Sequence, residues 1–310
     1  MAKTILLYGP SGSFKTSNIG QAAQWAVQRY GGVVRGLFGD NYGPLGWEVA
    51  NDIVEPWSLT TTPDPLACIL LAAQGYWPTN LVDGRATDKL AMTKAWDGVA
   101  GYIIEGLHEN GVLIMRNLEQ KQRSTGEPLV AEFGELVDGL KVQYAMASRG
   151  TYGFVQNQTH RYFKMGFAGL PVPWVFVTTH EFRGKDKSDK RLVGPMIVGK
   201  AMTGVTSQWF DHVLHFEQFN QQVTLSAEEQ KTAGVKTVLR AGSRAWFTRH
   251  PDEEVPSLMW PAKLGVEPWL MEHIYGRWPK GYIPLVNNAN GYVSSVRTLL
   301  ELIDPVEGDE

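Results

Sequence analysis

One short segment near the N-terminus combines the residue types that bind the phosphates of a nucleotide. It reads Gly9-Pro10-Ser11-Gly12-Ser13-Phe14-Lys15-Thr16 and stands between an apolar run and an Ala- and Gln-rich run. Glycines let the backbone curl around phosphate, the lysine supplies a cation for the β and γ oxygens, and the threonine hydroxyl can hold Mg²⁺. The segment therefore predicts a triphosphate site, with contacts from Gly9, Pro10, Ser11, Gly12, Ser13, Phe14, Lys15, Thr16 and Ser17.

One position of this segment departs from the usual G-x-x-x-x-G-K-[ST] pattern. Phe14 stands where the pattern has glycine. A side chain is readily tolerated there only if the backbone does not need a positive φ. The alternative interpretation is an ordinary glycine turn before a helix, but the preceding strand and the following Lys-Thr-Ser favour a phosphate loop.

Acidic residues at the ends of neighbouring strands are the expected partners of the metal and of water. Glu105 directly follows the apolar Tyr102-Ile103-Ile104, and we expect it to bind Mg²⁺ together with Thr16. Asp40 follows the second expected strand and is the candidate for orienting the attacking water. A solvated loop glutamate and a common Asp-Asn turn are the respective alternatives.

Another expected strand, Trp174 to Thr179, ends in polar residues. Thr178, Thr179, His180 and Glu181 stand where a sensor of the γ-phosphate would lie, and His180 is the candidate sensor. A capping or packing role for His180 is the alternative. A zinc-protease interpretation of His180-Glu181 is excluded because Gly184 occupies the position of the second histidine.

Cations beyond this strand are candidates for contacts with nucleic acid or with a neighbouring subunit's nucleotide. Residues 183–191 predict a mobile basic loop that grips a nucleic-acid backbone, a solvated hairpin tip being the alternative. Lys200 could reach a neighbouring subunit's γ-phosphate, and Arg240, Arg244 and Arg249 are competing candidates for that role. The expected nucleic-acid contacts are Arg183, Lys185, Lys187, Lys190 and Arg191.

The elements that position these residues follow from hydrophobic pattern and turn signals. Strand, glycine loop, helix and strand predict a βαβ unit and hence a parallel sheet. The expected strands are 4–8, 33–38, 99–104, 174–179, 212–216 and 235–239, and the expected helices are 15–30, 65–74, 88–95, 127–148, 152–167 and 292–303.

Length and composition limit the class of protein. The chain has 310 residues, 43% of them hydrophobic, a net charge of -3 and one cysteine, which excludes a disulfide framework and a cysteine-rich zinc site. Its longest apolar runs are too short to span a membrane, and we expect a soluble cytoplasmic protein. We expect a core over residues 1–249, with an irregular insertion at 41–86, and a Pro- and Trp-rich extension with an acidic tail over 250–310.

The chain resembles the RecA-like P-loop ATPases encoded by bacteriophages, relatives of phage recombination and single-strand annealing ATPases. The resemblance rests on ILLYGPSGSFKTS, YIIEGL at 102–107, Tyr152 to Gln156, LPVPWVFVTTHE at 170–181 and VGPMIVGKAMT at 193–203. It implies an α/β RecA-like fold with strand order 5-1-4-3-2, ATP and Mg²⁺ as ligands, homo-oligomers with sites between subunits, and action on single-stranded DNA in the host cytoplasm. By position, it matches Lys15 and Thr16 to the phosphate-loop pair, Glu105 to the second-motif acid, and Thr179-His180 to the sensor.

The sequence leaves several functions open besides an ATPase of DNA recombination. A DNA-packaging or remodelling motor would have the same fold. A nucleotide-dependent assembly switch would bind ATP with little turnover, and a small-molecule kinase would need an acceptor pocket. Turnover stimulated by DNA would distinguish the first two from the switch.

Overall fold

The structure is a computed structural model of the chain. It describes residues 1–39, 43–62, 64–86, 89–125, 130–132, 143–145, 150–185, 191–198, 203–248, 262–288 and 291–305.

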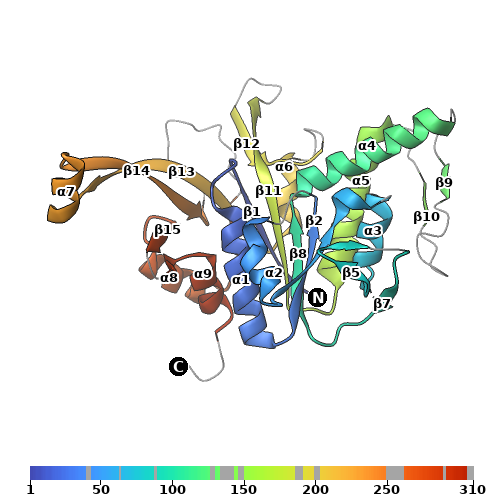
Figure 1. Ribbon diagram of the computed structural model, residues 1–310, viewed down its shortest axis with the longest axis horizontal. Helices are drawn as coiled ribbons and strands as arrows, with labels where there is room; N and C mark the ends of the chain where they lie inside the picture. Colours follow the sequence, from blue (N-terminus) through green and yellow to red (C-terminus); the bar gives the residue numbers. More distant parts are fainter. Residues whose placement is uncertain are drawn as a thin grey trace.

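A sheet of ten strands forms the centre of the molecule (Figure 1). Six of them are parallel: β1 (Lys3–Gly9), β2 (Val33–Phe38), β3 (Val54–Ser58), β8 (Val99–Glu105), β11 (Trp174–Lys185) and β13 (His212–Thr224). They lie in the order β13-β1-β11-β8-β2-β3. Counted in chain order without the outer β3, this is 5-1-4-3-2, so the predicted α/β fold and RecA-like strand order are confirmed.

Antiparallel strands extend this sheet beyond β13 and beside β11. These are β14 (Thr237–Trp246), β15 (Tyr282–Asn288), β16 (Gly291–Ser294) and, paired with β11, β12 (Arg191–Pro195). The outer parts of β13 and β14 project as a two-stranded arm with α7 (Ala227–Ala233) at its tip (Figure 1). A capping box between Ser226 and Glu229 starts α7, and none of its residues is buried.

Helices cover both faces of the sheet. They are α1 (Lys15–Tyr30), α2 (Gly46–Ala50), α3 (Pro65–Ala72), α4 (Leu107–Thr125), α5 (Gly150–His160), α6 (Thr203–Thr206), α8 (Pro268–Arg277) and α9 (Val296–Ile303). A π-helical turn, η3 (Arg161–Gly166), and a 3₁₀ turn, η4 (Phe167–Gly169), continue α5. Among the described residues, no helix has both the length and the apolar character needed to cross a membrane.

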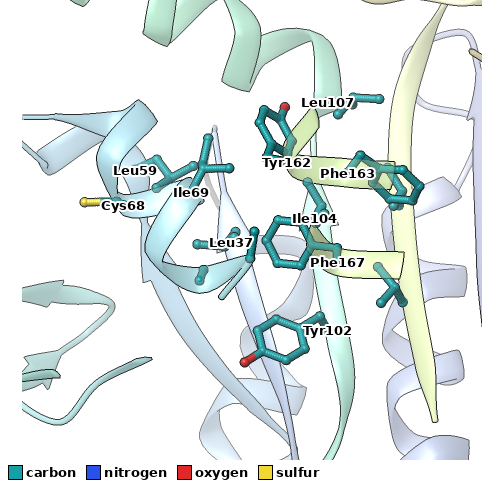
Figure 2. Packing of buried hydrophobic residues seen from close by; sticks show 14 of the residues in the cluster. Leu37, Leu59, Cys68, Ile69, Tyr102, Ile104, Leu107, Tyr162, Phe163 and Phe167 are labelled. Atoms are coloured by element: carbon teal, nitrogen blue, oxygen red, sulfur yellow. The ribbon is translucent and has the colours of Figure 1, made fainter. Parts of the chain in front are cut away.

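One layer of the core joins the sheet to α3, η3 and η4. Figure 2 shows side chains of the strands, such as Leu37 and Tyr102, gathered with Ile69 of α3 and Phe167 of η4. The ring centroids of Tyr102 and Phe167 are 5.7 Å apart. These residues are fully or almost fully buried, so this layer fixes the strands whose ends carry the candidate site.

The other layer joins the sheet to α1 and to the C-terminal helices. Apolar residues of β1 and α1 share one buried cluster with Ile274 of α8 and Leu299 and Leu300 of α9. The buried Asn18 side chain accepts a hydrogen bond from the Val296 amide at 3.0 Å, which attaches the start of α9 to α1. The last part of the chain thus supports the helix that follows the phosphate loop.

Several predicted elements differ from the structure. Residues 92–94, expected in a helix, form β7 (Met92–Lys94), paired with β4 (Tyr76–Pro78). The described parts of the expected helix 127–148 are strands, β9 (Val130–Glu132) and β10 (Gln143–Ala145), and the glycines of this stretch disfavour a helix. A further two-residue pair, β5 (Leu81–Val82) and β6 (Arg85–Ala86), and two 3₁₀ turns, η1 (Gly43–Leu45) and η2 (Leu59–Thr61), lie in the expected irregular insertion.

Candidate functional site

The glycine-rich segment is a tight loop between β1 and α1. Gly9 ends β1 so close to β13 that an added Cβ would meet the carbonyl oxygen of Phe216 at 2.4 Å. Gly12 has a φ of 73°, in the region that favours glycine, and its carbonyl accepts a hydrogen bond from Gln218 Nε2 at 2.5 Å. The loop therefore needs glycine at both positions for geometric reasons.

Phe14 adopts the left-handed conformation. Its φ is 65° and its ψ is 21°, so the condition that this position not need a positive φ is not met. The backbone has the shape that the usual glycine permits, and the phenylalanine follows it at an energetic cost of about 1–2 kcal/mol. The side chain remains 46% exposed at the rim of the loop.

Lys15 is the first residue of α1, and its side chain folds back onto the loop. Its Nζ donates to the carbonyl oxygens of Gly9 at 3.0 Å and Pro10 at 2.7 Å, and lies 3.3 Å from Ser13 Oγ. The residue is only 8% exposed. Burial lowers the pKa of Lys15 to about 8, against the opposing effect of nearby carboxylates, of which Glu105 is the strongest.

Glu105 ends β8 and bridges two neighbouring elements through its carboxylate. Oε1 accepts a hydrogen bond from Thr16 Oγ1 at 2.7 Å, and Oε2 accepts one from Thr178 Oγ1 at 2.5 Å. The Gly106 amide donates to the same Thr178 oxygen at 3.0 Å. Burial raises the pKa of Glu105, although the hydrogen bonds from Thr178 and Thr16 and the charge of Lys15 act in the opposite direction.

Thr16 and Glu105 provide the oxygen donors that Mg²⁺ prefers. Their side-chain oxygens already lie within hydrogen-bonding distance of each other, beside the lysine that would face the phosphates. Two protein oxygens are enough for Mg²⁺, because this ion takes most of its other ligands from substrate phosphates and water. Within the described parts of the chain, no group of three or more His, Cys, Asp or Glu side chains is arranged to hold a metal alone.

His180 lies opposite Gly9 in the parallel pairing of β11 with β1 and makes an ion pair with Glu109 of α4. The distance from His180 Nε2 to Glu109 Oε1 is 3.1 Å. The hydrogen bond to Glu109 raises the pKa of His180 above its usual value. For Glu109, burial alone would raise the pKa, but the hydrogen bond and charge of His180 outweigh it and lower the pKa.

These side chains surround one cavity of about 390 Å³ at the carboxyl edge of the parallel strands. Most of the predicted phosphate-contact residues line it, whereas Gly9 and Pro10 lie behind it. The lining residues are Ser11, Gly12, Ser13, Phe14, Lys15, Thr16, Ser17, Pro44, Glu105, Gly106, Glu109, Thr178, Thr179 and His180.

Glu109 was missed by the sequence reasoning. Glu105 and Glu109 are four residues apart, but the helix that begins at Leu107, directly after Gly106, was not expected there. Recognising 107–125 as a helix would have placed Glu109 in its first turn, next to the strand end.

A second buried polar group lies behind the phosphate loop. Glu181 of β11 and His215 of β13 are 2.5 Å apart at Oε2 and Nε2, and the Tyr8 ring of β1 packs 4.7 Å from the His215 ring. Arg183 also pairs with Glu181. These residues tie three strand ends together beneath the loop.

The other predicted site residues lie away from the cavity or outside the described residues. Arg183 and Lys185 are exposed near the end of β11, where it forms a hairpin with β12. Arg244 packs against three aromatic rings and binds Glu217 at 2.7 Å, an arrangement that supports the base of the arm. Outside the described residues, or with undescribed side chains, are Asp40, Lys187, Lys190, Arg191, Lys200, Arg240 and Arg249.

Comparisons with known proteins add little beyond this geometry. No protein-family model matches the chain, and no curated protein matches its sequence. Among solved structures, the chain is similar to the flagellar accessory protein FlaH from Methanocaldococcus jannaschii, with a TM-score of 0.37 and 8% sequence identity over 94% of this chain and 89% of that one.

Proposed function

We propose that the cavity binds ATP together with Mg²⁺ and that the protein hydrolyses the bound ATP. The observation that carries this proposal is the meeting of Lys15 and Thr16, from the loop between β1 and α1, with Glu105 from β8. A cation, a hydroxyl and a carboxylate are the groups that a triphosphate with its metal requires, and the N-terminus of α1 adds its positive dipole.

In this proposal each residue exchanges a protein partner for a ligand. Lys15 leaves the loop carbonyls and binds the β- and γ-phosphate oxygens. Thr16 and Glu105 would hold Mg²⁺, which neutralises phosphate charge when it is bound. Lys15 and the loop amides stabilise the charge that develops during transfer of the phosphoryl group to water.

The experiment is a calorimetric titration of ATP·Mg²⁺ into the parent and into Lys15→Ala. The variant removes the cation that faces the phosphates, so we expect its affinity to fall at least about 100-fold, an effect of about 3 kcal/mol. Lys3→Ala is the matched control, because Lys3 lies at the opposite end of β1. Unchanged affinity in Lys15→Ala would contradict the proposal.

Action on single-stranded DNA in phage recombination or annealing, by a homo-oligomer, is the finer part of the proposal. It draws on the family resemblance and on the basic hairpin that begins with Arg183 and Lys185 next to His180. Comparing ATP hydrolysis with and without single-stranded DNA tests it, since stimulation is expected only if DNA binding and the nucleotide site are coupled.

A nucleotide-dependent assembly switch is the second candidate. It is favoured by two departures from the usual sequence pattern, Phe14 in place of glycine and Glu105 in place of aspartate. Tight ATP binding with negligible hydrolysis, with or without DNA, would select the switch.

A further inference from the structure

The polar groups around the cavity hold one another in this structure. Lys15 binds loop carbonyls, Thr16 binds Glu105, and His180 binds Glu109. Each of these contacts occupies a group that a triphosphate would also use. Binding of a triphosphate is therefore an exchange of partners, and each exchange releases a group that was held before.

The two carboxylates of the site are held in different ways. Both oxygens of Glu105 accept hydrogen bonds from threonine hydroxyls. Oε1 of Glu109 forms an ion pair with His180 Nε2. Oε2 of Glu109 is buried and accepts no hydrogen bond from another described residue. An unsatisfied buried acceptor is unfavourable, so the contact with His180 is the main side-chain interaction that holds Glu109 in this position.

Gly106 makes room for this position of Glu109. A Cβ at Gly106 would meet Glu109 Oε2 at 2.8 Å, and the φ of Gly106 is 71°. The carboxylate thus lies against the backbone of Gly106, and both residues line the cavity.

A γ-phosphate is the ligand that separates this pair. His180, Lys15 and Glu109 all line the same cavity, so we expect a phosphate group bound beside Lys15 to contact the imidazole. The phosphate is a strong acceptor for a charged donor and competes with Glu109 for His180. A nucleoside diphosphate lacks the group that competes.

We propose that Glu109 is the residue that accepts the proton of the attacking water, and that His180 withholds it until a γ-phosphate is bound. This inference rests on the proposed function. The water oxygen forms a bond to the γ-phosphorus while the bond from that phosphorus to the bridging oxygen breaks, and the diphosphate keeps the electron pair. The water proton passes to Glu109 and then to solvent, and His180 acts as a positioning residue.

A purely structural role is the alternative. A glutamate in the first turn of a helix is stabilised by the helix dipole, and its pair with His180 could serve the fold alone. The alternative predicts that changes at Glu109 lower stability and leave nucleotide selectivity unchanged. The two interpretations therefore differ in turnover and in the preference for ATP over ADP.

The experiment compares Glu109→Gln with Glu119→Gln, a matched change at an exposed position of the same helix. We expect Glu109→Gln to lower kcat at least about 100-fold with ATP affinity within about threefold of the parent, and Glu119→Gln to behave as the parent. His180→Ala should reduce the ratio of ATP to ADP affinity. The NMR signals of the His180 ring should shift with a non-hydrolysable ATP analogue and much less with ADP.

Three outcomes would overturn the inference. They are parent-like turnover in Glu109→Gln, loss of ATP binding in that variant, and a parent protein that binds ATP without hydrolysing it. The third outcome leaves the proposed nucleotide binding intact. Failure of the parent to bind ATP would instead refute the proposed function itself.

Discussion

The two ends of the parallel sheet use similar polar residues in opposite ways. At the amino end, Thr4 and Asp211 bond reciprocally: Asp211 Oδ2 accepts from the Thr4 amide at 2.8 Å and from its hydroxyl at 2.9 Å. The Asp211 amide donates back to Thr4 Oγ1 at 2.9 Å. These contacts join β1 to the start of β13.

At the carboxyl end, comparable hydrogen bonds surround a cavity. Thr16 and Glu105 bond at 2.7 Å, much like Thr4 and Asp211, but beside a buried lysine and an acid with one unsatisfied oxygen. In the proposed function, these groups exchange their protein partners for oxygen atoms of the ligand. If the cavity binds ATP as proposed, the space and the charges next to the hydrogen bond between a hydroxyl and a carboxylate are what distinguish the two ends.

The largest expected effect comes from replacing Glu105, the carboxylate at the carboxyl end of the sheet. Glu105→Gln should lower ATP turnover about 100-fold, because it removes a charge that acts through the metal and the transition state, while ATP affinity stays appreciable. It should not lower thermal stability, since burial disfavours the charged form of Glu105 and raises its pKa. Steady-state hydrolysis and thermal unfolding are the measurements.

Asp211→Ala is the matched change at the amino end. It removes the acceptor of two hydrogen bonds from Thr4 and should lower the free energy of unfolding by about 1–2 kcal/mol with unchanged turnover per folded molecule. The contrast between the two ends fails if Glu105→Gln loses stability and keeps turnover.

The next effect concerns two histidines whose pKa values are shifted in opposite directions. His212, at the start of β13, is 2% exposed and stacks on Trp174, and burial lowers its pKa to about 4. Between pH 6.5 and 4 the unfolded chain binds a proton that the folded chain rejects, so stability falls as the pH falls. The total loss from His212 is about 3 kcal/mol.

His212→Phe keeps an aromatic ring against Trp174 and removes the titration. Unfolding by urea at pH 7 and at pH 4.5 should show a smaller loss of stability for the variant than for the parent. The pKa of His180 is raised, so its contribution has the opposite sign: it is present at low pH and is lost as the pH rises through the folded pKa. A parent and a His212→Phe variant with parallel pH dependence would show that His212 does not titrate as inferred.

Sequence predicted the first βαβ unit well because each of its boundaries has a local cause. The glycines after β1 and after α1, and the apolar runs between them, define β1, α1 and β2 without information from the rest of the fold. The order of the parallel strands followed from the family resemblance and agrees with the structure.

Other features depend on tertiary context that the sequence does not show. The apolar run from Val112 to Met115 lies in α4, and this helix packs against α5 and α3, which are distant in sequence. The length of β13 and β14 as an arm depends on their pairing with each other. The pair of His180 and Glu109 joins residues 71 positions apart, and its members become neighbours only when β11 and α4 are placed together.

The smallest expected effect concerns backbone strain at Phe14, in the loop at the carboxyl end of the sheet. Among the described residues, the non-glycine positions with positive φ are Phe14, Asp52 and Asp83. Aspartate adopts this conformation comparatively often, whereas a bulky aromatic residue seldom does. Phe14 is thus the unusual case, and it lies in the phosphate loop.

Phe14→Gly and Phe14→Ala together separate the strain from the ring. Both variants remove the ring, but alanine keeps a Cβ at a φ of 65° and glycine does not. Relief of strain by about 1–2 kcal/mol, less about 0.5–1 kcal/mol for the greater freedom of glycine in the unfolded chain, predicts that Phe14→Gly is more stable than Phe14→Ala by about 0.5–1 kcal/mol. Chemical denaturation of both variants measures this difference directly. Equal stability of the two variants would show that the loop relaxes to a negative φ when the ring is absent. The positive φ of Phe14 would then be caused by the position of its ring at the cavity rim and not by the turn itself.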